Sequence, residues 1–65
     1  MITVNEIRIE WHQGMTVSQV LAAMKYTFSH IMVTVDGVHV AEHDHDSFTV
    51  PDGADVKAIH IFHGG

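Results

Sequence analysis

The sequence predicts an α+β fold, with a mixed sheet of about five strands and one main helix packed on one face. Two β-rich runs near the N-terminus, one stretch of helical apolar spacing, and a later hairpin followed by a C-terminal strand support it. The 65 residues allow a single domain, 1–65. A chain of this size buries roughly 60% of its unfolded surface, so any working part should lie on the surface or at an end.

The first two strands are expected at residues 2–5 and 7–11, as a hairpin that turns at Asn5-Glu6. Apolar and polar residues alternate in the second run, which predicts one buried face. That face is formed by Ile7, Ile9 and Trp11.

A helix should begin after Thr16, because apolar residues then recur at the i, i+3, i+4, i+7 spacing of an amphipathic helix. Thr16 is the expected N-cap, with Gln19 completing a capping box. The helix should end near residues 26–29, a stretch that contains Thr and Ser.

The second half of the chain reads as a hairpin, a polar segment and a last strand. Asp36-Gly37 is the strongest short-range turn signal in the chain. The other elements are expected in the order strand 30–35, strand 38–41, a loop or single helical turn at 42–47, the short run 48–50, a turn at 51–53 and strand 55–62.

Two hairpins around one helix, closed by a final strand, can bury the helix only against a single mixed sheet. The economical topology pairs the first and last strands in the middle, and a right-handed crossover makes the strands on either side of the helix parallel. This is the β-grasp arrangement, the fold of ubiquitin.

In the final strand, period two places Val56, Ala58, His60 and Phe62 on one face and Lys57, Ile59, Ile61 and His63 on the other. Lysine almost never faces a core, so the Val56 face is expected inward. Ile59 and Ile61 would then form an exposed apolar patch beside the C-terminus. In the alternative, the register is reversed or bulged and both isoleucines are core residues.

The amino-acid composition excludes several classes of function for this protein. Of the residues, 46% are hydrophobic and 17% charged, typical of a globular chain. No apolar run approaches the roughly 18 residues of a membrane span, and the N-terminus does not resemble a signal peptide, so a cytoplasmic protein without membrane partners is expected. A formal charge of -5, with three scattered basic residues, disfavours nucleic acid. The lack of cysteine excludes disulfides and thiol nucleophiles.

Seven histidines are unusual in a chain this short. His43 and His45, with the acids beside them, could supply metal ligands. An i, i+2 pair points the same way only in an extended strand, however, and this segment reads as a loop. We therefore expect a solvated polar loop and no metal site, with His43 and His45 as the candidates if one exists.

Several motifs occur together in a family-specific order. They are an opening MI-VN strand, a Gly-x-Thr-Val helix start, the hairpin VTVDGVHV, the turn PDGADV and a terminal Gly64-Gly65. Over essentially its whole length the chain resembles the bacterial sulfur carriers of the ubiquitin-like group, most closely the ThiS family, with the MoaD family more distant.

The resemblance implies a protein co-substrate and not an enzyme. An adenylating partner of the ThiF/MoeB kind would use ATP to activate the carboxylate of Gly65, which would become a thiocarboxylate; this chain would itself bind no cofactor. The tail 63–65 would be flexible, with Gly64 thin enough to enter a narrow site and His63 hydrogen-bonding there or carrying a charge where imidazole titrates. The outer residues Lys57, Ile59 and Ile61 would dock the partner.

The acceptor is left open by the sequence. A thiazole synthase-like partner in thiamine biosynthesis is favoured by length and overall resemblance, with molybdopterin or cysteine/homocysteine synthesis as alternatives. A ubiquitin-like modifier joined to lysine through Gly65, and a histidine-rich metal-binding module, are the other classes. The free protein is expected to be monomeric.

Overall fold

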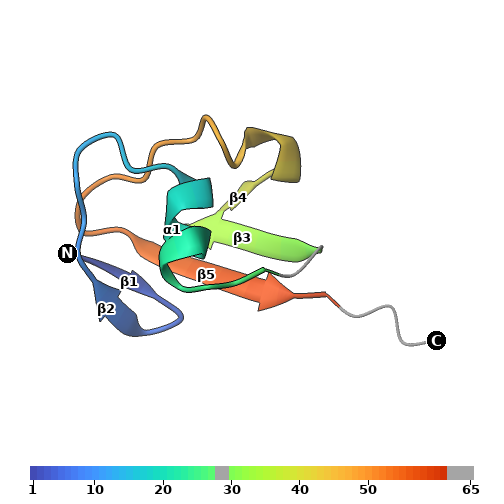
Figure 1. Cartoon of the computed structure of the whole chain (residues 1–65), viewed down its shortest axis with the longest axis horizontal. Coiled ribbons are helices and arrows are strands. Elements are labelled where there is room, and N and C mark those ends of the chain that lie inside the picture. The colour runs from blue at the N-terminus through green and yellow to red at the C-terminus, as the bar shows by residue number, and fades with distance from the viewer. Residues whose placement is uncertain (28–29, 62–65) are drawn as a thin grey trace.

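The computed structural model describes residues 1–27 and 30–61 of the chain, arranged as one sheet with one α-helix over it (Figure 1). The elements are β1 (Ile2–Val4), β2 (Ile7–Ile9), α1 (Val17–Ala23), β3 (Ile31–Val35), β4 (Val38–Val40), the 3₁₀ helix η1 (Glu42–Asp44) and β5 (Asp55–His60). The N-terminus and the end of β5 lie at opposite ends of the sheet (Figure 1).

The strand order is β2-β1-β5-β3-β4, which places the first and last strands in the centre as the sequence predicts. β1 and β5 are parallel, with Val4 opposite Val56, and every other neighbouring pair is antiparallel. It follows that β2 and β3, on either side of the helix, run in the same direction. The mixed β-grasp sheet is therefore confirmed.

Both hairpins turn at the predicted dipeptides. Asn5 and Glu6 have φ of 50° and 71°, and Asp36 and Gly37 have φ of 50° and 82°. Two successive residues at positive φ make a type I′ turn, whose twist matches that of the strands it joins.

The helix begins as expected and ends early. The backbone N–H of Gln19 donates to Thr16 Oγ1 at 3.2 Å and the backbone N–H of Thr16 donates to Gln19 Oε1 at 3.1 Å, so the capping box is confirmed. The predicted end near 26–29 is wrong, because Lys25 adopts a left-handed φ of 59°. The Tyr26 N–H then donates to the Leu21 carbonyl at 2.9 Å, which is the closing bond of a Schellman motif.

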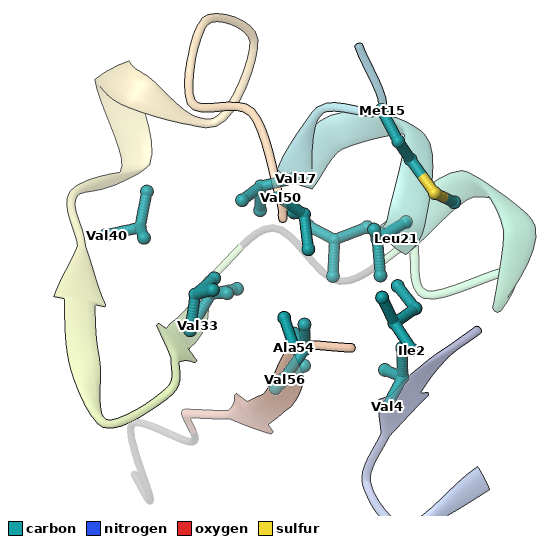
Figure 2. Close-up of a cluster of buried hydrophobic side chains, with 13 residues drawn as sticks. Ile2, Val4, Met15, Val17, Leu21, Val33, Val40, Val50, Ala54 and Val56 are labelled. Atoms are coloured by element: carbon teal, nitrogen blue, oxygen red, sulfur yellow. The ribbon is translucent and has the colours of Figure 1, made fainter. Parts of the chain in front are cut away.

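The core lies between α1 and one face of the sheet. Val17 and Leu21 of the helix face Ile2, Ala54 and Val56 from the strands and the segment before β5 (Figure 2). Full burial of a valine or leucine contributes about 1.5–3 kcal/mol, so this interface supplies most of the stabilisation available to a short chain. No second helix covers the opposite sheet face within the described residues.

The second predicted strand is shorter than expected. The run 7–11 pairs only over Ile7–Ile9. The predicted inward position of Ile7 is wrong, since Ile7 is 53% exposed on this edge strand. Trp11 lies beyond the strand, and its Nε1–H donates to the Val50 carbonyl at 2.7 Å.

The run 48–50 forms no strand and is instead attached to the start of the helix. A single bridge joins Thr49 to Thr16. The N–H of Val17 donates to the Phe48 carbonyl at 3.1 Å, and the N–H of Val50 donates to the Met15 carbonyl at 2.7 Å. These bonds satisfy backbone groups that a strand would have paired with the sheet.

Candidate functional site

The last strand presents the predicted faces. Val56 and Ala58 are buried, whereas Ile59 and Ile61 are 52% and 43% exposed on the opposite face. Lys57 shares that outer face and is half-buried, with its Nζ 3.7 Å from Asp55 Oδ1. The alternative in which the isoleucines are core residues is therefore wrong.

A third apolar side chain joins the two isoleucines. Met32 of β3 lies directly opposite Ile59 in the antiparallel register and is 36% exposed. We call Met32, Ile59 and Ile61 the outer patch. Sequence analysis missed Met32, although its period-two position between the apolar neighbours Ile31 and Val33 was a usable signal.

The outer patch continues into a shallow hollow of about 280 Å³. Met32 and Ile61 form one side of the hollow, and the β4 edge and the start of η1 form the other, through His39, Ala41 and Glu42. No sequence signal pointed to this hollow, because it depends on how β4 and the end of β5 are placed around β3.

The last described residue, Ile61, is part of the outer patch. The N–H of Ile61 donates to the His30 carbonyl at 3.1 Å, which continues the β3–β5 pairing one step beyond β5. His60, predicted to face inward, is half-buried. Phe62, His63, Gly64 and Gly65 lie outside the described residues, so their predicted roles stay predictions.

The histidine-rich segment differs from the expected solvated loop at one position. His43 is exposed, with Nε2 3.6 Å from Asp44 Oδ2. His45 is only 7% exposed, because its backbone carbonyl accepts a 2.9 Å hydrogen bond from the Ser18 N–H and holds the segment against the helix. Within the described residues, no hydrogen-bond partner reaches His45 Nε2.

Neither metal candidate has a ligand set around it in the part of the chain that the structure describes. No group of three or more His, Asp or Glu side chains is placed there to hold an ion. Among the same residues, no helix has the length and apolar character needed to cross a membrane.

The strand order, the single helix on one face and the apolar patch where the last strand ends define a small β-grasp protein of the ubiquitin-like class.

The particular family follows from comparison with known proteins: the chain belongs to the ThiS family, whose model matches residues 2–65. It is similar to the crystal structure of the thiamine biosynthesis protein ThiS from Geobacter metallireducens, with a TM-score of 0.73 and 26% identity, over 98% of this chain and 97% of that one. A solution structure of a thiamine biosynthesis protein from the same organism gives a TM-score of 0.72 and 25% identity, over 98% and 86%. Among curated proteins, no sequence matches the chain.

Membership of this family supports a role as a small sulfur carrier in thiamine biosynthesis. Such a protein is not itself the catalyst; it works with an adenylating enzyme and a sulfur acceptor.

Proposed function

We propose that Gly65 carries the sulfur as a C-terminal thiocarboxylate that serves thiazole formation. A carboxylate is a poor electrophile, so its oxygen first attacks the α-phosphate of ATP in a partner enzyme, giving an acyl-adenylate and releasing pyrophosphate. A sulfur nucleophile then attacks the carbonyl carbon. The C–S bond forms as the bond to AMP breaks, and the product donates its sulfur to the thiazole precursor.

One observation carries the proposal: the family match runs through the last residue and so includes both terminal glycines. Gly64 and Gly65 have no Cβ, so an extended tail built from them is thin enough to enter a narrow activating site. His63 directly precedes them, where it would hydrogen-bond to the walls of that site. ATP belongs to the partner in this scheme.

The outer patch is the proposed docking surface for the adenylating enzyme. Its three side chains are partly exposed and include the last described residue, Ile61, so a partner that covers them would also hold the tail. Burying such side chains contributes about 25 cal/mol per Å² of apolar area. Lys57 lies on the same outer face of β5 and would give the patch a polar edge.

Removing Gly65 tests the chemistry. The shortened protein should lose ATP–pyrophosphate exchange with the adenylating enzyme and retain its circular dichroism spectrum, because Gly65 follows the last strand. Retained exchange would overturn the mechanism. Mass spectrometry of the protein from cells should show one terminal oxygen replaced by sulfur, whereas branched lysine adducts would mark a protein modifier.

Two isoleucine substitutions, one in the outer patch and one distant from it, test the docking surface. Ile59→Asp should raise the KM for the carrier in the exchange assay at least tenfold. Ile7→Asp is the matched control, because Ile7 is 53% exposed, as Ile59 is to 52%, but lies on the distant edge strand β2. Equal effects of the two substitutions would contradict docking at the outer patch.

A further inference from the structure

Acidic residues are concentrated in one part of the chain. Residues 26–56 contain six of the eight acids and no Lys or Arg. The six are Asp36, Glu42, Asp44, Asp46, Asp52 and Asp55. Asp52 and Asp55 contact the N-terminal ammonium and Lys57, which leaves the acids after β4 as the main uncompensated negative charge.

Glu42 is the acid that lines the hollow together with two residues of the outer patch. These two residues are Met32 and Ile61. Glu42 is exposed, and among the described residues no ion pair involves it. The lining of the hollow therefore combines apolar side chains with one carboxylate, Glu42, and two histidines, His30 and His39. That combination fits an apolar side chain flanked by a basic one.

The adjoining strand β4 is an edge of the sheet. In a two-residue hairpin the residues flanking the turn form a hydrogen-bonded pair, and bonded and non-bonded pairs then alternate. Val35 and Val38 flank the turn, so the N–H and C=O of His39 point away from β3 toward the open edge. An extended segment can add to these groups as a further strand.

The other edge, β2, has the same geometry but different chemistry. By the same rule Arg8 directs its main-chain groups outward there. Its side chain carries a charge that discourages strand addition, and the hollow beside β4 is not lined by β2 residues. β4 is therefore the edge that suits a partner.

We infer that an extended segment of the adenylating enzyme, with Lys or Arg beside one apolar residue, adds to the β4 edge and places that apolar side chain in the hollow. The inference rests on the proposed function and specifies its partner surface. A second copy of this chain is the wrong occupant, because it would bring a second set of acids against Glu42.

Charge reversal tests the inference in the ATP–pyrophosphate exchange assay. Glu42→Lys should raise the KM for the carrier about five- to tenfold and leave kcat unchanged, since a rim charge acts on binding. Glu10→Lys makes the same change in net charge at an exposed residue after β2 and should leave KM unchanged. Added salt should raise the wild-type KM more than that of Glu42→Lys. Equal KM values for Glu42→Lys and wild type would overturn the inference.

The Gly65 deletion in the same assay distinguishes a failure of this inference from a failure of the proposed function. If the deletion abolishes exchange and Glu42→Lys has no effect, the inference fails and the proposed function stands. If the deletion has no effect, the proposed function itself fails.

Hydrogen exchange tests strand addition directly. When the adenylating enzyme is added, the amide of His39 should become at least tenfold more protected, whereas the amide of Arg8 should not change. Protection of neither amide, or of both equally, would overturn pairing at β4.

Discussion

Replacing Asn5 tests how the first hairpin is joined to the last strand. Asn5 Nδ2 donates to the Ala58 carbonyl at 3.0 Å, and Asn5 Oδ1 accepts from the Ala58 N–H at 2.9 Å. The same Nδ2 donates to the Tyr26 hydroxyl at 3.2 Å. The side chain therefore continues the β1–β5 pairing where the backbone turns away, and it does so at a left-handed φ of 50°.

The cost of Asn5→Ala has two parts. It leaves both backbone groups of Ala58 without these partners, at about 1 kcal/mol for each of the two partly buried hydrogen bonds. Alanine is also less tolerant than asparagine of a left-handed backbone, which adds about 1 kcal/mol. The sum of about 3 kcal/mol is large against the roughly 3–10 kcal/mol expected for a chain of this length. The melting temperature should fall by about 12–24 °C.

Urea denaturation followed by Trp11 fluorescence measures this loss, since the half-buried indole is bonded to Val50. Asn5→Gly is the control, because glycine accepts the left-handed backbone but lacks the amide. It should cost about 1 kcal/mol less than Asn5→Ala. A loss below about 0.5 kcal/mol for Asn5→Ala, within the range of an ordinary surface change, would refute the reasoning.

Two further substitutions should maintain or raise the free energy of unfolding, whereas most substitutions lower it. Lys25→Gly should raise the free energy of unfolding by about 0.5–1 kcal/mol, because glycine adopts the left-handed conformation of this position, C′ of the helix, without strain. Lys25→Ala is the control and should give no gain. An equal gain from both would contradict backbone strain as the cause. His45→Leu should leave stability unchanged or raise it by about 1 kcal/mol, because it removes a buried nitrogen that lacks a hydrogen-bond partner among the described residues. His45→Ala should lower stability, because it also removes packing contacts. Urea denaturation checks both, and a leucine variant no more stable than the alanine variant would contradict the second.

Sequence analysis was most successful where neighbouring residues decide the outcome. The type I′ turns at Asn5-Glu6 and Asp36-Gly37 and the capping box at Thr16 depend on backbone sterics and hydrogen bonds within four residues. The alternation that exposes Ile59 is equally local, because one inward residue sets the face of every other residue in a regular strand. These signals predicted the sheet, the helix start and most of the outer patch.

The errors arose where segments distant in the chain compete for the same backbone groups or the same space. His45 looks solvent-exposed in a polar run, yet its carbonyl bonds to Ser18 and burial follows. The sequence assigned no partner to the run 48–50, and the backbone groups that it bonds to belong to the start of α1, more than 30 residues earlier in the chain.

For this chain, then, local chemistry specifies the turns, the helix cap, the outward isoleucines and the glycine tail. The fold sets Met32 directly opposite Ile59, buries His45 and brings Glu42 and the β4 edge to a hollow that Ile61 also lines. The physical reason is that propensity and alternation act over a few residues. Burial and surface shape depend on contacts between residues far apart in sequence, which form only when the helix and all five strands pack together.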